Sequence, residues 1–305
     1  MKAGPRSVFA YGATGRIGRP LVRALIPDVE RGSLDLRLGV RSLPDRDETL
    51  PDGVRWVLSD LDWSVDALSR SMSGCDTLFL LTGYTAAMVP QSERAIAAAA
   101  QAGVRHVVHL GAHAAAATKI AHLGWHLEAE RRIESSGLDW THLRPNWLMQ
   151  NVLRAVQAVP GGLRIECSVP AGRSVSWVDA EDVGAVAANI LRDPEKHRGQ
   201  TYLLAPERKS FSEVAEIFSR VLGIPCEVYE TPSEALATRL MGHGEPGYAL
   251  SALHYMETLR AGGAPECADT LNIDSLLGGQ AAGWPQFVEK HRSVFLGQDA
   301  RTASQ

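Results

Sequence analysis

A glycine-rich turn after the first apolar run is the feature that most constrains the fold. Gly12, Gly15 and Gly18 are spaced Gly-x-x-Gly-x-x-Gly between the apolar residues 8–11 and a stretch with apolar residues at helical spacing. In a strand–turn–helix unit the first glycine permits a tight turn, the second lets backbone N–H groups approach a pyrophosphate, and the third allows close helix–strand packing. This context favours a dinucleotide site over an empty turn. The loop residues expected to contact the cofactor are Gly12, Ala13, Thr14, Gly15, Arg16 and Ile17.

Apolar runs alternate with helical patterns through the first half of the chain. The expected strands are residues 8–11, 34–40, 54–58, 77–81, 106–110 and 140–143. This alternation predicts an α/β fold with a doubly wound parallel sheet of the Rossmann type. After Pro145, proline and glycine interrupt the elements more often. We therefore expect an NADP-binding Rossmann domain in residues 1–150. A smaller α/β substrate-side lobe in residues 151–305 would pack on it across a soft boundary and return strands to the main sheet.

Composition narrows the function classes. The 305 residues are 45% hydrophobic and 22% charged, with a formal net charge of −4, as in an ordinary globular protein. No basic field exists to attract nucleic acid, so no nucleic-acid partner is expected. No run approaches the roughly 20 apolar residues of a membrane span, and no signal segment precedes the glycine motif. The sequence thus predicts a cytoplasmic protein without membrane contact, and it leaves a homodimer open. Four scattered cysteines without paired spacing predict no metal site.

Cofactor choice is made about 20 residues beyond the glycine loop, at the end of the second strand. Arg41 stands there instead of a carboxylate, and Arg16 lies in the loop. Two guanidinium groups favour a 2′-phosphate, hence NADP(H), although Arg41 as a solvated loop residue is the alternative. Asp60, with Leu61 after the third strand, is expected either to bind the adenine or to cap a helix near Trp63.

Pro20 fits poorly inside a helix that follows the loop directly. Its missing N–H would leave a carbonyl near Arg16 unpaired. We therefore expect a late helix start or a local distortion.

Several further segments resemble the NmrA-like branch of the atypical short-chain dehydrogenases/reductases. They are residues 11–18, 104–112, 126–130, 136–141, 143–151 and 178–183, with a C-terminal pattern from Leu277 to Phe295. The resemblance spans nearly the whole chain. It implies that the cofactor also lies against Thr82, Gly83 and Tyr84 after the fourth strand, Gly111 and Ala112 after the fifth, and Pro145 and Trp147 after the sixth.

The chain departs from the family pattern at the catalytic positions. Gly111 and Ala112 replace the serine of complete superfamily members, and the segment from His122 to His126 stands where Tyr-x-x-x-Lys would lie. His122 and His126 share one helix face. We expect His126, and less strongly His122, to position the nicotinamide ribose or to relay a proton, with plain packing as the alternative. His106, His109, His113 and His142 are expected to be packed or solvated, and no metal is expected because the metalloprotease spacing is missing.

Two functions remain. The first is an NAD(P)H-dependent oxidoreductase that reduces a small apolar, quinone-like or polycyclic aromatic substrate, with little activity on simple alcohols or ketones. The second is a non-catalytic NAD(P)-sensing regulatory protein of the NmrA type. The glycine-punctuated segment from Thr238 to Ala261, with Gly242, Gly244 and Gly247, is a candidate lid and favours the enzyme.

Overall fold

The computed structural model describes residues 5–43, 53–243 and 245–297, without the side chains of 240 and 243. These residues form two compact units. The first contains the described residues up to Ala112, together with His122–Arg144 and Val183–Leu203. The second contains His113–Ala121, Pro145–Asp182 and the described residues from Leu204 on. The second unit holds most of the expected C-terminal lobe, while Val183–Leu203 returns to the first unit.

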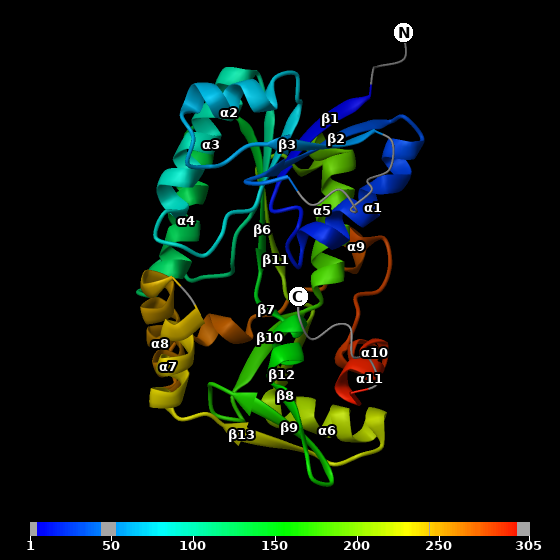
Figure 1. Cartoon of the computed structure of the whole chain (residues 1–305), viewed down its shortest axis with the longest axis vertical. Coiled ribbons are helices and arrows are strands. Elements are labelled where there is room, and N and C mark those ends of the chain that lie inside the picture. The colour runs from blue at the N-terminus through cyan, green and yellow to red at the C-terminus, as the bar shows by residue number, and fades with distance from the viewer. Residues whose placement is uncertain (1–4, 44–52, 244, 298–305) are drawn as a thin grey trace. The chain divides into compact units, whose positions relative to one another are not determined.

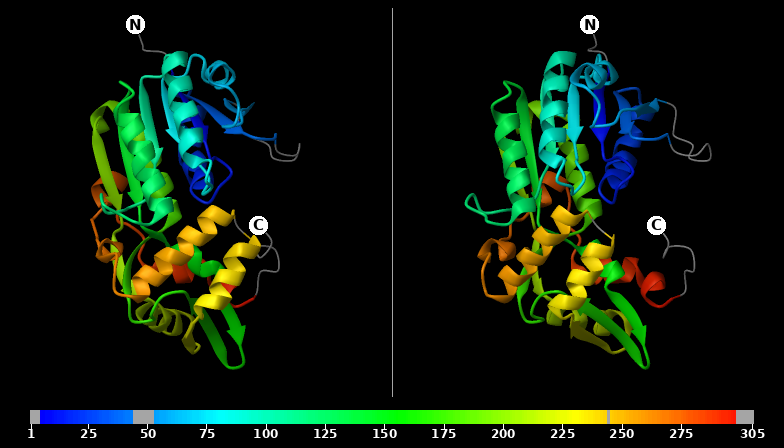
Figure 2. Two further views of the ribbon diagram at one scale, coloured as in Figure 1. Left: turned by 90° about the vertical axis from the view of Figure 1, so that its left-hand side faces the viewer. Right: turned by 60° about the vertical axis from the view of Figure 1, so that its left-hand side comes forward.

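A seven-stranded sheet in the order β11-β6-β5-β4-β1-β2-β3 organises the first unit (Figure 1). The pairs from β6 through to β3 are parallel. The sheet is doubly wound, as the alternating pattern predicts, because α2, α3 and α4 cover one face and α1 and α5 the other (Figures 1 and 2). The strands are β1 (Arg6–Tyr11), β2 (Leu34–Val40), β3 (Val54–Leu58), β4 (Thr77–Leu80), β5 (His106–Leu110), β6 (Asp139–Pro145) and β11 (Gln200–Leu204). The helices are α1 (Gly18–Glu30), α2 (Val65–Met72), α3 (Met88–Ala102), α4 (Ala121–Glu134), α5 (Ala180–Arg192) and the 3-10 turn η2 (Pro194–His197).

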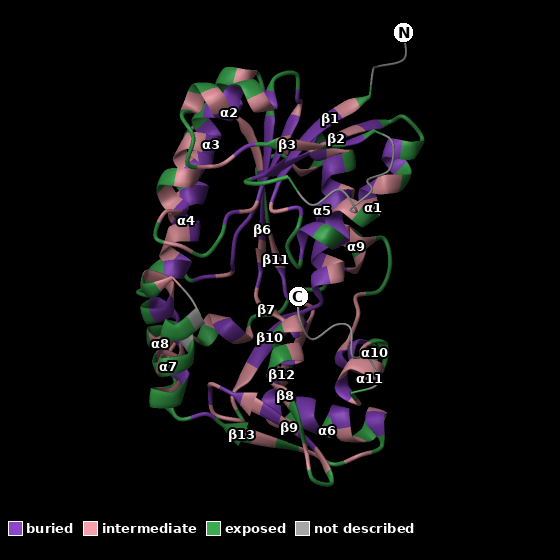
Figure 3. Cartoon of the chain, in the orientation of Figure 1, coloured by how far each residue is buried: buried purple, intermediate pink, exposed green. Residues whose placement is uncertain are grey.

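The central strands are buried on both faces. All residues of β4 and β5 are buried, as are five of the six in β1 (Figure 3). A sheet covered by helices needs apolar side chains on both sides, which is why these strands appear in the sequence as continuous apolar runs. Six predicted strands therefore coincide with observed ones to within two residues at each end.

The start of α1 accommodates Pro20. The helix begins at Gly18, so Pro20 is its third residue. The amide groups of a first helical turn have no acceptor inside the helix, and proline therefore leaves no helical hydrogen bond unmade there. The expectation of a late helix start is confirmed.

The second unit has two three-stranded sheets, in the orders β12-β10-β7 and β13-β9-β8. Their strands are β7 (Trp147–Leu148), β8 (Val156–Val159), β9 (Gly162–Cys167), β10 (Ser174–Val178), β12 (Glu207–Ser210) and β13 (Cys226–Glu230). The helices are α6 (Phe211–Leu222), α7 (Ser233–His243), α8 (Pro246–Arg260), α9 (Asp274–Leu277), α10 (Trp284–Lys290) and α11 (Arg292–Phe295), with 3-10 turns η1 (Met149–Arg154) and η3 (Pro265–Ala268). Ser210 and Glu213 form a capping box that fixes the start of α6. Trp177 and Trp284, both fully buried, meet edge to face in the core of this unit.

The segment expected to be a lid is mostly helical. It contains the C-terminal end of α7 and the whole of α8. The first residue of α8 is Pro246, and the carboxylate of Glu245 caps the N-terminus of this helix. Gly242 lies within α7 and Gly247 in the first turn of α8, whereas Gly244 lies outside the described residues. A lid role stays a prediction.

Within the described ranges, no helix combines the length and the apolar character that crossing a bilayer requires.

Close backbone packing at Gly18 predicts a sharp response to one methyl group. A Cβ at this position would lie 2.0 Å from the carbonyl oxygen of Gly12, so Gly18→Ala must displace the loop or the helix. We expect a loss of about 1–3 kcal/mol in the free energy of unfolding, measured by urea denaturation. Gly124→Ala in α4 is the matched control, because nothing lies within 4 Å of its Cβ, and it should raise stability by up to about 1 kcal/mol. Equal stability of Gly18→Ala and the wild type would contradict the packing argument.

Candidate functional site

The glycine loop has the geometry of a phosphate-binding turn. Gly12 has a φ of +78°, and a Cβ there would lie 2.7 Å from the side chain of Leu81. The N–H of Gly15 donates to the carbonyl of Gly12 over 3.0 Å and closes the turn. No side chain caps the N-terminus of α1. Its first amide groups and the positive end of the helix dipole therefore suit an anion.

A cavity of about 470 Å³ lies beside this loop in the first unit, where β1, β2, β3 and β4 end. The carboxyl ends of strands in an open parallel sheet are where ligands bind. Six expected cofactor residues line the cavity, and they come from four separate segments: Gly12, Thr14, Arg41, Asp60, Leu61 and Gly83. The structure thus brings together residues that lie up to 71 positions apart in the chain.

The other expected cofactor residues do not line this cavity, and cofactor contact stays a prediction for both groups. Four are neighbours in the glycine loop or its helix entry: Ala13, Gly15, Arg16 and Ile17. Thr82 and Tyr84 flank Gly83, and Gly111 and Ala112 are buried after β5.

Pro145 and Trp147 belong to the second unit. There the indole ring of Trp147 packs among Trp177, Phe211 and Tyr255, and its Nε1–H lies 3.4 Å from the hydroxyl of Tyr255.

Asp60 does not cap a helix. The helix after β3 begins at Val65, and its capping residue is Ser64, whose hydroxyl accepts the N–H of Ala67. Oδ1 of Asp60 instead accepts the N–H of Asp62 in a local turn. The capping alternative is therefore wrong, because the helix begins five residues after Asp60 and Ser64 is its capping residue. Asp60 is half-buried at the cavity wall, where a carboxylate can accept an amino group.

Sequence reasoning missed several residues of the cavity wall. They are Ser42, Ser59, Leu81, Thr85 and Gln91, with Gly39 and Val40 from the end of β2. Ser59 directly follows β3 and hydrogen-bonds the hydroxyl of Tyr11 over 2.7 Å. Burial raises the pKa of Tyr11 to about 12, so this phenol stays neutral. The rule that ligands gather at strand ends could have found Ser42 and Ser59, whereas Gln91 lies on α3 and carried no such signal.

His122 and His126 lie on α4 and are buried, with 6% and 3% of their surfaces exposed. Both rings meet the ring of Tyr84 edge to face, at centroid distances of 5.9 Å and 5.3 Å. Burial lowers the pKa of His122 to about 4 and that of His126 well below 6.5. Both imidazoles are therefore neutral at pH 7, beneath a tyrosine that is 43% exposed.

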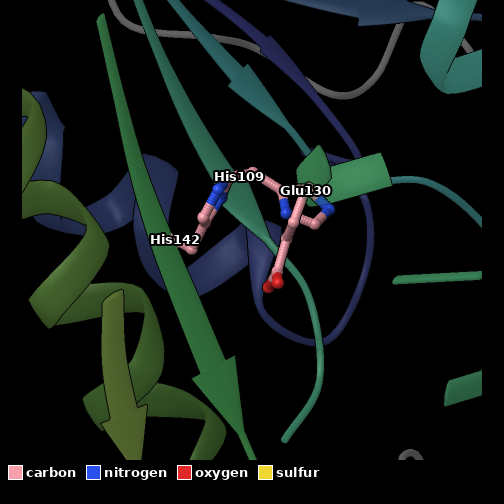
Figure 4. A group of neighbouring side chains, drawn as sticks. All are labelled: His109, Glu130 and His142. Carbon is pink, nitrogen blue, oxygen red and sulfur yellow. The ribbon is translucent and has the colours of Figure 1, made fainter. Parts of the chain in front are cut away.

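The other histidines, which were expected to be packed or solvated, differ in burial and in their hydrogen-bond partners. His106 is buried and hydrogen-bonds Thr141 over 2.9 Å, and Nε2 of His113 pairs with Asp269 over 2.9 Å. His109 and His142 are fully buried on neighbouring strands and lie beside the carboxylate of Glu130 (Figure 4). These three residues bring one potential metal-ligand atom each to within 4.8 Å of one another.

Glu130 is held by Arg144. Nε of Arg144 donates to Oε1 over 2.9 Å, and Nη2 donates to Oε2. The pair joins α4 to β6, and it raises the pKa of Arg144. Burial, reinforced by the Arg144 charge, lowers the pKa of His109 to about 3.

Comparison with known proteins matches residues 6–275 to the NmrA-like family. An NAD(P)H azoreductase of Xenophilus azovorans is 30% identical over 294 residues, which cover 94% of this chain and 99% of the relative. The NADPH complex of the quinone oxidoreductase QOR2 of Escherichia coli superposes with a TM-score of 0.76 at 22% identity, covering 93% and 99% of the two chains. NmrA, a negative transcriptional regulator solved in complex with NADP, superposes with a TM-score of 0.78 at 17% identity, covering 99% and 98%.

Proposed function

Because the chain belongs to the NmrA-like family, we propose that it is an NADP(H)-dependent oxidoreductase that reduces a small apolar acceptor of the quinone-like or aromatic kind. The observation that carries the proposal is the cavity at the glycine loop, with Arg41 in its wall. The azoreductase similar over nearly the whole chain supports reduction of an extended conjugated acceptor.

Arg41 supports NADP(H) over NAD(H). It is exposed just after β2 and lines the cavity together with Ser42. The tip of β2 reads Arg41-Ser42-Leu43, without the carboxylate that would accept a ribose 2′-hydroxyl and repel a 2′-phosphate. Arg16, exposed in the loop, adds a second cation. The guanidinium group of Arg41 is therefore assigned to the 2′-phosphate.

Arg41→Ala should remove most of the preference for NADPH while leaving the NADH affinity nearly intact. Hydrogen bonds to a charged phosphate contribute about 1.5–3 kcal/mol, which corresponds to roughly ten- to a hundredfold in the dissociation constant. Calorimetric titration of both cofactors measures the ratio. Arg70→Ala, an exposed arginine on α2 that does not line the cavity, is the control and should leave both affinities unchanged. Equal affinity of the wild type for NADPH and NADH refutes the assignment.

The reaction must proceed without a tyrosine–lysine pair. Hydride transfer to a quinone or azo compound spreads the new negative charge over a conjugated system, so a strong positioned acid matters less than for a ketone. Positioning of the acceptor against the nicotinamide then supplies much of the acceleration. The neutral, buried imidazoles of His122 and His126 fit a role in holding the cofactor better than a role as cationic acids at pH 7.

A panel of acceptors tests the activity. The wild type should oxidise NADPH with benzoquinones, naphthoquinones and azo dyes, and should show little activity with simple ketones, measured at 340 nm. Quinones and azo dyes should react faster than ketones because their conjugated systems spread the negative charge that hydride transfer adds.

The alternative is a cofactor-sensing regulator, and the structural similarity to NmrA with NADP favours it as the second candidate. Tight NADPH binding with no turnover of any acceptor would decide for the regulator. Turnover of ketones at the same rate as quinones would contradict the proposed chemistry.

His126→Asn should raise the KM for NADPH and lower kcat by less than tenfold, because a neutral buried imidazole positions the cofactor. Loss of a proton-transfer group would instead reduce kcat by about 10²–10⁴-fold. His106→Asn is the control matched for burial, since His106 is also buried with a pKa lowered to about 4 and its ring hydrogen-bonds Thr141 on β6. A fall of kcat by a hundredfold or more in His126→Asn, with unchanged NADPH binding and intact folding, would identify a proton relay.

A further inference from the structure

We propose that His109, His142 and Glu130 form a binding site for one divalent transition-metal ion in the first unit, of the kind that takes imidazole and carboxylate ligands, such as Zn²⁺. The site links three elements, since His109 lies on β5, His142 on β6 and Glu130 on α4 (Figure 4). None of the three residues lines the cavity at the glycine loop, although the ring of His109 lies 6.1 Å from that of His126, so Zn²⁺ binding is measured separately from NADPH turnover.

The first argument is geometric. One ligand atom from each residue lies within 4.8 Å of the others, and all three residues are buried. Zinc bonds of about 2.0–2.2 Å place tetrahedral ligand atoms about 3.3–3.6 Å apart, so the side chains need to draw in by roughly an ångström. Gly111 leaves the space beside them clear. A Cβ there would lie 3.1 Å from Cε1 of His109 and 3.3 Å from Oε1 of Glu130.

The second argument is the lack of hydrogen bonds to the imidazoles. His109 and His142 have no exposed surface, and none of their ring nitrogens has a hydrogen-bond partner among the described residues. A buried polar atom without a partner costs about 1–3 kcal/mol, so such groups are rare in folded proteins. A metal ion satisfies one lone pair on each ring at once.

His142 also has the outer contact typical of a metal-ligating histidine. Its Nε2 lies 3.4 Å from Oε1 of Glu134, close to a carboxylate without a formed hydrogen bond. Ligating histidines commonly direct their second ring nitrogen to such a carboxylate, which fixes the tautomer. A proton on Nε2 facing Glu134 would leave the Nδ1 lone pair for the ion.

The charge of the site limits which ion it takes. Arg144 already bonds both oxygens of Glu130 and neutralises its charge, but each carboxylate oxygen has a second lone pair. With Glu130 neutralised, the site resembles a three-histidine zinc site in net charge. Two imidazoles and one carboxylate favour zinc and its neighbours in the transition series over Ca²⁺ or Mg²⁺, which prefer oxygen ligands only.

Metal binding by the untagged, chelator-treated protein is the direct test, with Zn²⁺ and Co²⁺ as probes. After gel filtration, elemental analysis by inductively coupled plasma mass spectrometry should find one Zn²⁺ per chain. Saturation should raise the melting temperature by about 4 °C when free Zn²⁺ exceeds the dissociation constant a hundredfold. His109→Gln and His142→Gln should each weaken Zn²⁺ binding by at least about tenfold. His113→Gln is the control and should leave binding unchanged, because it removes the His113–Asp269 pair outside the cluster.

The Co²⁺ spectrum keeps the test decisive even where a variant fails to fold. Wild-type protein with one Co²⁺ should show the intense visible bands of a four- or five-coordinate ion. Weak octahedral bands, no retained Zn²⁺ in folded wild type, or loss of binding in His113→Gln but not in His142→Gln would each overturn the proposal.

Discussion

The contact between Gly18 and the carbonyl of Gly12 is the constraint on which the first unit depends. With no room for even a methyl group there, α1 starts directly against the end of β1 and keeps its N-terminal amide groups at the sheet edge. Gly184 continues this close packing on the other side, since a Cβ there would lie 2.6 Å from Cβ of Pro20 and 2.7 Å from the backbone nitrogen of Leu21. The backbones of helices α1 and α5 are therefore in close contact. The position of the glycine loop beside the cavity depends on Gly18 and Gly184, which are far apart in the chain.

A second constraint lies on the opposite face, where α4 covers β5 and β6. Apolar packing alone does not hold it, because Glu130 is almost fully buried and its charge is stabilised by Arg144. Removing one partner of such a pair typically costs about 3–5 kcal/mol, since the other charge stays buried. The same region holds the imidazoles of His109 and His142, whose ring nitrogens make no hydrogen bond to any described residue. A ligand that binds these buried polar atoms would stabilise the folded state. This stabilisation is the physical argument for a metal ion at this place.

Much of the first unit could be predicted from the sequence, because strands such as β1 and β5 are buried on both faces and give continuous apolar runs. Arg41 and Asp60 could also be predicted, because ligands bind at the carboxyl ends of parallel strands and both residues follow such ends. Contacts that helices make with the sheet could not be predicted in this way. Gln91 reaches the cavity from α3, and the pairing of Glu130 with Arg144 joins positions 14 residues apart on different elements. Periodicity places such a residue on one face of a helix or strand but does not identify the residue that it contacts. Each histidine was therefore predicted separately to be packed or solvated, and the grouping of His109 and His142 with Glu130 was missed.

The burial of the α4 histidines limits the chemistry that the proposed enzyme can perform. Burial lowers the pKa of His122 to about 4 and that of His126 well below 6.5, so at pH 7 neither ring carries the extra proton that a strong acid would donate. Reduction of a simple ketone needs such a proton as the alkoxide forms. A quinone or azo acceptor holds the added charge on its own conjugated system and can take its proton from water later. The proposed acceptor class is therefore the one that fits the desolvation that keeps these rings neutral.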